Sequence, residues 1–278
     1  MENEDGLDEN ADPEDENSFS NKSVPKRMLI TVAGALMNLS LGFILMTVLV
    51  LMSPKLGSTV VHSFDENATS SQQLMVEDEI IKVGNVRVHT WNELAYEIMN
   101  SGYKPTDITV IRNGEKLVLE DVVFSTFDES GATFGEVDFI PYAEHKTFGN
   151  LVKHAFFRSL STVKMVIDSV VGLITGRFGV EAVSGPVGVV GVMENAAKEG
   201  FMSFMYIVSV LSINLGVFNL IPFPALDGGR LLFLGIEGII RRPVNKKVES
   251  YINFAGIVIL FALMIFITCK DVLNLIFK

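Results

Sequence analysis

NLIPFPALDGGR, residues 219–230, closes a long apolar run and decides how the rest of the chain is interpreted. Pro222 and Pro224 interrupt that run, because proline has no backbone N–H and its ring clashes with the preceding helical turn. Asp227 follows, with two glycines directly after it. An ionisable group close to a bilayer core is costly, and such groups usually face a bundle interior and serve an ion or a proton. The stretch therefore predicts a broken membrane helix that presents one functional carboxylate.

A second interpretation of Asp227 requires no ligand. An aspartate before GGRLLFLGIEGII can cap a helix, because its side chain can accept hydrogen bonds from the free N–H groups of the first turn. From the spacing alone, the cap and the functional carboxylate are equally supported.

The membrane interpretation depends on three long runs without a charged residue, at 28–52, 201–226 and 251–269. About 20 apolar residues in a helix cross a bilayer core of about 30 Å. Buried helices of soluble proteins rarely continue for 19 residues or more without any charge. We therefore expect a multi-pass α-helical membrane protein with three transmembrane helices, for which the lipid bilayer is a partner.

Basic residues beside the runs predict the orientation of the chain, because short cytoplasmic flanks carry an excess of lysine and arginine. One basic group precedes the first run and the other separates the second run from the third. Their members are Lys22, Lys26 and Arg27, and then Arg241, Arg242, Lys246 and Lys247. Both groups indicate the cytoplasm, so residues 55–200 are expected on the outer side of the membrane.

Charge and rare residues exclude several kinds of site. The formal net charge is -11, but the first twenty residues hold nine acids and no base, so the rest of the chain carries only about -2. We expect this acidic tail, residues 1–21, to be disordered and cytoplasmic, and no nucleic acid is expected as a partner. Cys269 is the only cysteine, which excludes intrachain disulfides and multi-cysteine zinc sites.

The outer insert begins with a small α/β pattern. We expect strands at Glu79–Val83 and Val86–Val88 separated by a Gly84–Asn85 turn, a helix at Trp91–Met99 capped by Thr90 and Glu93, and a hairpin of Ile108–Arg112 with Lys116–Val123. EDEIIKVGNVRVHTW is similar to the GDxIxxxNG segment of PDZ domains in bacterial proteases, although Glu77 replaces a glycine and the NG order is reversed. This resemblance implies a PDZ-like domain at 55–125. Such a domain either captures an extended peptide at a sheet edge or only restricts access.

The second half of the insert, residues 126–200, is expected to be a linker with one amphipathic helix at 147–175. One face of this helix is polar, the opposite face is apolar, and it can lie on the membrane surface or be an ordinary half-buried helix. The polar residues are His154, Arg158, Ser161, Lys164 and Asp168, and the apolar residues are Phe156, Leu160, Val163, Ile167 and Val170. SGPVGVVG, residues 184–191, is rich in glycine and predicts a tight loop.

The opening stretch resembles the NxxPxPxLDGG motif of the site-2 protease family of intramembrane zinc metalloproteases, in its bacterial branch with a PDZ insert. KRMLITVAGALMNLSLGF is similar to the R…AGPxxN helix of that family; the shared residues are Arg27, Ala33, Gly34 and Asn38, and Ala35 replaces the proline. SGPVGVVG is similar to the family's loop before the last two helices. The resemblance covers about residues 19–275, with membrane segments at 22–54 and 201–278.

The resemblance implies a role for each residue of the motif. Asp227 is expected to be the third protein ligand of a catalytic Zn2+, with Gly228 and Gly229 completing the motif. Asn219 is expected to hold the unwound substrate, while Pro222 and Pro224 shape the break beside it. The other two zinc ligands of the family are the histidines of an HExxH helix, whose glutamate is the general base. Three protein ligands leave one zinc position for water.

No HExxH occurs in this chain. We therefore expect an N-terminally truncated protein that binds Zn2+ only with the missing helix and is inactive by itself. The leading hypothesis is the C-terminal portion of a bacterial inner-membrane zinc metalloendopeptidase that cleaves the transmembrane segments of single-span membrane proteins. The alternative is a non-catalytic paralogue that binds substrates through its PDZ domain. A transporter is less well supported, because the two halves show no inverted repeat.

Overall fold

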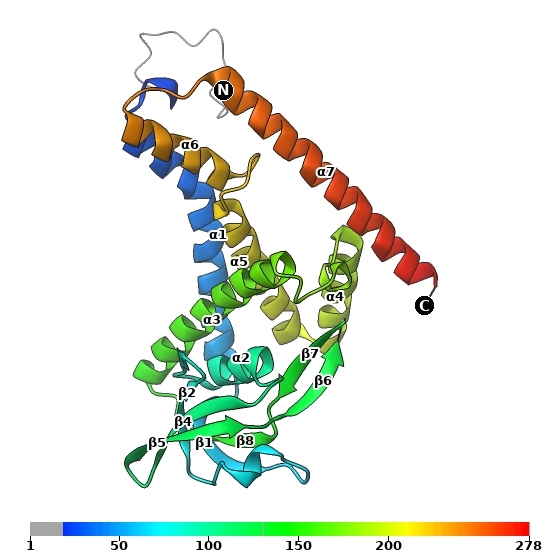
Figure 1. Cartoon of the computed structure of the whole chain (residues 1–278). Helices are drawn as coiled ribbons and strands as arrows, with labels where there is room; N and C mark the ends of the chain where they lie inside the picture. Colours follow the sequence, from blue (N-terminus) through cyan, green and yellow to red (C-terminus); the bar gives the residue numbers. More distant parts are fainter. Residues whose placement is uncertain (1–18, 130, 278) are drawn as a thin grey trace. The chain divides into compact units, whose positions relative to one another are not determined.

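The structure is a computed structural model that describes residues 19–129 and 131–277 (Figure 1). Most of the acidic tail predicted for residues 1–21 lies outside the described residues. The chain divides into two compact units, and each is described by itself. The first unit contains the described residues up to Leu41 together with those from Leu211 onward, and the second extends from Gly42 to Val210.

The three predicted membrane helices are confirmed as helices long and apolar enough to cross a bilayer. They are α1 (Val24–Met52), α5 (Phe201–Leu220) and α7 (Lys246–Ile276). Many of their large apolar side chains are exposed, including Met37, Leu215 and Phe254. Helices that are apolar on all sides need an apolar surrounding, which lipid supplies.

Small residues let the first and second of these helices approach closely. A Cβ built on Gly216 of α5 would lie 3.0 Å from the carbonyl oxygen of Ala35 and 2.7 Å from Cγ of Leu39, both on α1. Ala35 itself is fully buried. Close backbone contact at small residues is a common way for membrane helices to associate, because dispersion forces act only at short range. The contact therefore depends on the absence of a side chain at position 216.

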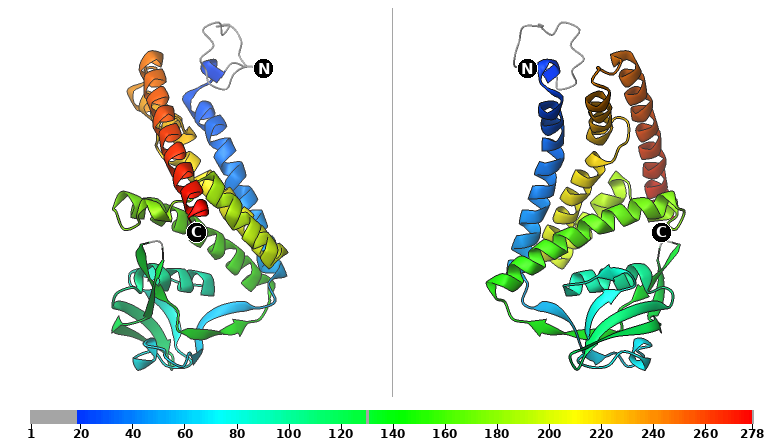
Figure 2. Two further views of the ribbon diagram at one scale, coloured as in Figure 1. Left: turned by 90° about the vertical axis from the view of Figure 1, so that its right-hand side faces the viewer. Right: turned by 60° about the vertical axis from the view of Figure 1, so that its left-hand side comes forward.

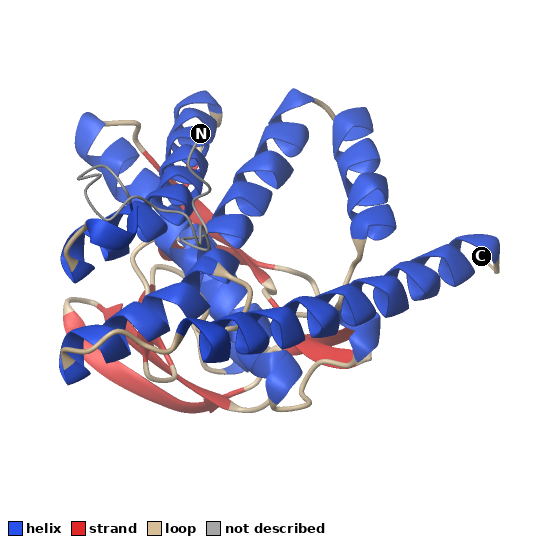
Figure 3. Cartoon of the chain, turned by 90° about the horizontal axis from the view of Figure 1, so that it is seen from above, coloured by secondary structure: helices blue, strands red, loops and turns tan. Residues whose placement is uncertain are grey.

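The second unit is built on an antiparallel sheet, which Figure 3 shows in red. Its strand order is β5-β4-β2-β1-β8, and β3 pairs with β2. The strands are β1 (Leu56–Phe64), β2 (Glu79–Val83), β3 (Val86–Arg87), β4 (Thr106–Arg112), β5 (Glu115–Val122) and β8 (Phe139–Glu144). Two more strands, β6 (Ser125–Glu129) and β7 (Ala132–Glu136), form a separate hairpin. The buried core lies between the sheet and α2 (Trp91–Ser101) and includes Val61, Ile80, Leu94, Ile98 and Ile108.

Local sequence signals in the sheet are confirmed. The strand at Glu79–Val83 has the predicted bounds. Thr90 caps α2 and forms a capping box with Glu93, whose carboxylate accepts a 3.1 Å hydrogen bond from the Thr90 N–H. Asn113 and Gly114 both have positive φ in the turn of the predicted hairpin.

The sheet also continues beyond residue 125, where the sequence pattern had placed the end of the PDZ-like domain. β8 pairs with β1 along its length, and the pairs include Leu56 with Glu144 and Phe64 with Phe139. Neither strand was predicted.

The expected amphipathic helix is present as α3 (Phe148–Ile174), which begins at Thr147, where the threonine side chain accepts a hydrogen bond from the Asn150 N–H. Figure 2 shows α3 as one long helix beside the sheet. Its polar face is turned inward: Lys164 pairs with Glu97 at 2.8 Å, and the Tyr96 hydroxyl donates a 2.7 Å hydrogen bond to Asp168. The apolar face, including Phe156, Leu160 and Ile167, is half-exposed.

The loop predicted for SGPVGVVG is wrong. Residues from Pro186 onward form a helix, α4 (Pro186–Glu199). Pro186 occupies the first turn, where its fixed φ suits a helix and its missing N–H costs nothing. The glycines in this segment lower helix propensity by about 1 kcal/mol each relative to alanine. The alanines and other good helix formers that follow within the same helix outweigh that cost.

Candidate functional site: the helix break at residues 219–230

The predicted break is present between α5 and α6 (Asp227–Ile240). α5 ends at Leu220, and both prolines lie in the loop that follows. Ala225 adopts a positive φ of 75°, and Leu226 is extended. The chain therefore leaves one helix and enters the next through a compact turn.

The two glycines of the motif let this loop fold back over the first turn of α6. A Cβ built on Gly228 would lie 2.1 Å from the carbonyl oxygen of Ile221, and one on Gly229 would lie 2.4 Å from the carbonyl oxygen of Phe223. Real Cβ atoms do not approach other atoms this closely, and both obstacles are backbone. Only glycine therefore fits at these two positions without a movement of the main chain.

α7 holds the loop from the other side. The Asn253 side chain accepts a 3.3 Å hydrogen bond from the N–H of Ala225. A Cβ built on Gly256 would lie 2.6 Å from both the Cβ and the carbonyl oxygen of Pro224. We missed both α7 residues in the sequence. The sequence feature that could have indicated them is an asparagine and a glycine, three residues apart, within an apolar run, since polar and small residues often mark contacts between membrane helices.

Asp227 is the first residue of α6, and Leu226 is the N-cap. The structure therefore places Asp227 inside the helix and not at the cap position that the simpler interpretation required. A carboxylate in the first turn is favourable, because it faces the positive end of the helix dipole. The side chain is half-buried.

The Asp227 carboxylate faces α1. Its Oδ2 atom lies 3.9 Å from the position of a Cβ on Gly34, within the AGALMN segment that the sequence singled out. Gly34 itself is exposed, so this side of the carboxylate is not covered by a side chain at position 34. Two segments far apart in the chain therefore meet at one carboxylate.

The remaining predicted residues lie nearby on the same elements. Asn38 is four residues after Gly34 on α1, so the two share one helical face. Asn219 lies in the last turn of α5, directly before the break. Both asparagines are partly buried, Pro224 is partly buried, and Pro222 is exposed.

An ion pair joins α1 to α6 beyond the motif. The Arg27 guanidinium donates through both terminal nitrogens to the Glu237 carboxylate, with one N–O distance of 3.2 Å. Both side chains are largely buried. Arg27 was part of the predicted pattern, whereas Glu237 was missed. Its signal was a single acid within an otherwise apolar helix.

The described residues do not by themselves form a zinc site. Within 19–129 and 131–277, no three His, Cys, Asp or Glu side chains gather in a group able to hold a metal ion. Catalytic zinc needs three protein ligands and one open position. Asp227 has the chemistry of one such ligand, but one carboxylate is too few, so these residues alone do not fit a catalytic zinc ion.

Comparisons with known proteins find a matching family model and several relatives. The family model described as Peptidase family M50 matches residues 6–263. The chain is 32% identical over 269 residues to zinc metalloprotease RasP of Shouchella clausii (strain KSM-K16), which covers 92% of this chain and 62% of that protein. It is 30% identical over 264 residues to regulator of sigma-W protease RasP of Bacillus subtilis (strain 168), which covers 92% of this chain and 61% of that protein. The chain thus spans about three fifths of the length of these relatives.

Proposed function

The chain belongs to peptidase family M50, and from that membership we propose that it is the C-terminal portion of an intramembrane zinc metalloprotease of the site-2 type. The observation that carries this proposal is the Asp227 carboxylate. It lies at the helix break, where Gly228 and Gly229 allow the loop to pack closely on α6, and it faces Gly34 of α1. A carboxylate placed beside an uncovered helix surface suits a metal ligand better than a structural cap.

In this proposal, Asp227 supplies one ligand of the zinc ion. The remaining ligands and the general base come from a protein segment outside this sequence, which is consistent with the greater length of the relatives. The chain alone is then inactive. Asn219, at the end of α5, holds an unwound substrate backbone through its side-chain amide, while Pro222 and Pro224 keep the break open beside it.

We further propose the bacterial inner membrane as the location, with the sheet unit on the outer side and the N-terminal tail in the cytoplasm. The basic flanks of the apolar helices support this orientation. The substrates are single-span membrane proteins. One relative is named a regulator of sigma-W protease, which fits a role in releasing a transcriptional regulator from the membrane.

The sheet unit is proposed to be PDZ-like. Its capping box, helix and hairpin fit that pattern, and it either recruits substrates or restricts their access. The second candidate function follows from the same unit. If no segment with an HExxH sequence joins this chain, it is a non-catalytic protein that binds membrane substrates.

The test supplies the missing segment. The full chain is produced alone and together with the HExxH-bearing segment of the Bacillus subtilis relative, and cleavage of a single-span reporter is measured in membranes. We expect cleavage only in the combined sample, and its loss in Asp227→Asn. Asp65→Asn is the matched control, since Asp65 is exposed and lies in the sheet unit. Cleavage that survives Asp227→Asn would overturn the ligand assignment, and reporter binding without cleavage in every sample would favour the non-catalytic protein.

A further inference from the structure

Arg158 of α3 has a partly buried side chain, and its buried Nε atom has no hydrogen-bond partner. In the part of the chain that the structure describes, this Nε is the one buried side-chain nitrogen or oxygen without a partner. Its Cζ lies 5.2 Å from the ring centroid of Tyr206, within the range of a cation–π contact. Burial lowers the pKa of Arg158 from its ordinary value, but arginine stays charged in proteins. A buried, partly unpaired cation usually marks an absent water, ion or ligand.

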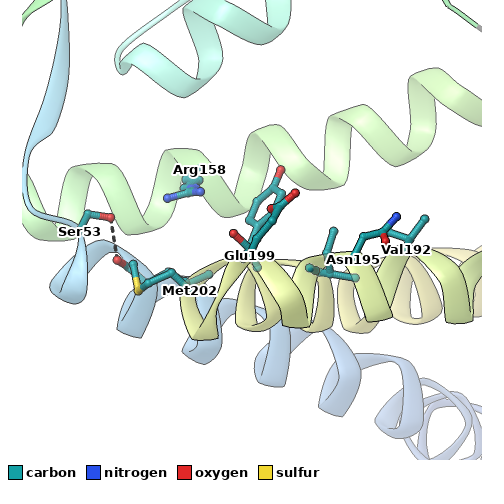
Figure 4. A pocket seen from close by; sticks show the side chains of 11 residues that line it. Ser53, Arg158, Val192, Asn195, Glu199 and Met202 are labelled. Atoms are coloured by element: carbon teal, nitrogen blue, oxygen red, sulfur yellow. Dashed lines mark hydrogen bonds between the residues drawn. The ribbon is translucent and has the colours of Figure 1, made fainter.

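This guanidinium borders a cavity of about 530 Å³ within the second unit (Figure 4). The last turn of α1 and the residue after it contribute Leu49 and Ser53, while α4 contributes Asn195 and Glu199. The start of α5 contributes Met202 and Tyr206. Residues far apart in the chain therefore converge on one space around Arg158.

The lining of the cavity has polar and apolar parts. Val192 and Met202 present hydrocarbon surface, and Asn195 and Ser203 present hydrogen-bonding groups. Glu199 is the carboxylate of the lining, and it is exposed. The cavity thus offers one cation, one separate anion and an apolar wall.

The position of the cavity indicates what kind of ligand reaches it. Leu49 and Ser53 stand at the end of one candidate membrane span, and Met202 and Tyr206 stand in the first turns of another. The ends of membrane-spanning helices lie at the level of the lipid headgroups. A ligand at this depth with an anionic group, an amine and a hydrocarbon part is a phospholipid.

We propose that this cavity binds the headgroup of a zwitterionic, ethanolamine-type phospholipid. The Arg158 guanidinium donates to the phosphate oxygens, Asn195 and Ser203 add hydrogen bonds, and Glu199 accepts from the ammonium group. The acyl chains leave along Val192 and Met202 toward the bilayer. This proposal does not depend on the protease proposal.

Binding is measured on the full chain purified in mild detergent, by native mass spectrometry with dioctanoyl phosphatidylethanolamine. We expect the wild-type chain to bind one lipid, and Arg158→Gln to bind it at least about tenfold more weakly, since charge-assisted hydrogen bonds are among the stronger ones. Dioctanoylglycerol, which lacks the phosphate, should not bind. Glu199→Gln should lose the preference for the ethanolamine headgroup over dioctanoyl phosphatidylglycerol. Lys198→Gln is the matched control, because Lys198 is highly exposed on α4 and pairs with Glu194.

Several results contradict the proposal. Equal lipid binding by Arg158→Gln, or equal binding of dioctanoylglycerol, would show that the phosphate is not recognised at Arg158. Arg158-dependent binding of an acetylated peptide with a free carboxyl end, in place of lipid, would reassign the cavity to a peptide terminus. If circular dichroism shows that Arg158→Gln is unfolded, Arg158→Lys is tested in its place, because lysine keeps the positive charge but lacks the planar guanidinium group. It should then bind several-fold more weakly than wild type, and unchanged binding would refute the phosphate contact.

Discussion

Replacing Gly228 by alanine tests how the helix break is held together. The added Cβ would lie 2.1 Å from the carbonyl oxygen of Ile221 and 2.5 Å from that of Leu220. Cβ contacts below 3.0 Å essentially do not occur, so the loop must move by almost 1 Å. Overpacking typically costs about 1–3 kcal/mol, and we expect the upper end because no side-chain rotation relieves a clash with backbone. The thermal midpoint should then fall by roughly 6–12 °C.

Gly235→Ala provides the matched control on the same helix. Nothing lies within 4 Å of a Cβ at position 235. Alanine has the higher helix propensity, so this variant should be unchanged or more stable by up to about 1 kcal/mol. Both variants are followed by circular dichroism during heating in detergent, and by hydrogen exchange of the amides between residues 219 and 230. Equal midpoints and equal exchange in the two variants would refute the claim that the loop packs against Gly228.

The remaining predictions concern the sheet unit. Asp78 is fully buried and accepts two 2.7 Å hydrogen bonds from Arg112. Because the Arg112 side chain is partly exposed and stays hydrated when its partner is removed, Asp78→Ala should destabilise this unit by about 1.5–3 kcal/mol in denaturant unfolding; a loss below about 1 kcal/mol would contradict the contribution of this pair. His154 is buried against Glu144, near Lys153 and Arg158, and burial lowers its pKa below the ordinary value of 6.5. The unfolded chain therefore binds the proton more tightly, and the stability that His154 contributes is present above pH 6.5 and is lost as the pH falls below it. Unfolding measured at pH 7.5 and pH 5 should show a smaller loss in His154→Gln than in wild type, and an identical loss would refute this source of pH dependence.

Features set by neighbouring residues were the ones that the sequence predicted well. The apolar runs became α1, α5 and α7, the Asn113–Gly114 turn formed, and Glu93 closed its capping box. The pairing of β1 with β8 was missed, because it joins residues such as Leu56 and Glu144 that are far apart in the chain. Such pairing depends on tertiary context and leaves no local pattern.

Tertiary context also decided the helices of the second unit. The polar face of α3 turned inward because Glu97 and Tyr96 on α2 supply partners for Lys164 and Asp168. Periodicity identifies the two faces of a helix but not which of them finds partners. The expected loop at 184–191 was wrong for a local reason instead: Pro186 suits the first turn of a helix, and the good helix formers that follow it offset the cost of the glycines.

The prolines, the two glycines and Asp227 predicted a helix break at residues 219–230, and the structure adds how the loop is held in place. Gly34 faces the Asp227 carboxylate, and Asn253 and Gly256 of α7 support the loop. These contacts join α1, α6 and α7, and they could not be predicted from the spacing of residues within the motif.

The most direct test of the central claim is zinc binding by the chain combined with the HExxH-bearing segment. Metal content and the zinc-edge X-ray absorption spectrum are measured for the wild-type chain, Asp227→Asn and the control Asp65→Asn. We expect one bound zinc with a carboxylate oxygen ligand in wild type and in Asp65→Asn, and loss of that ligand with much weaker binding in Asp227→Asn. An unchanged spectrum and unchanged zinc affinity in Asp227→Asn would contradict it.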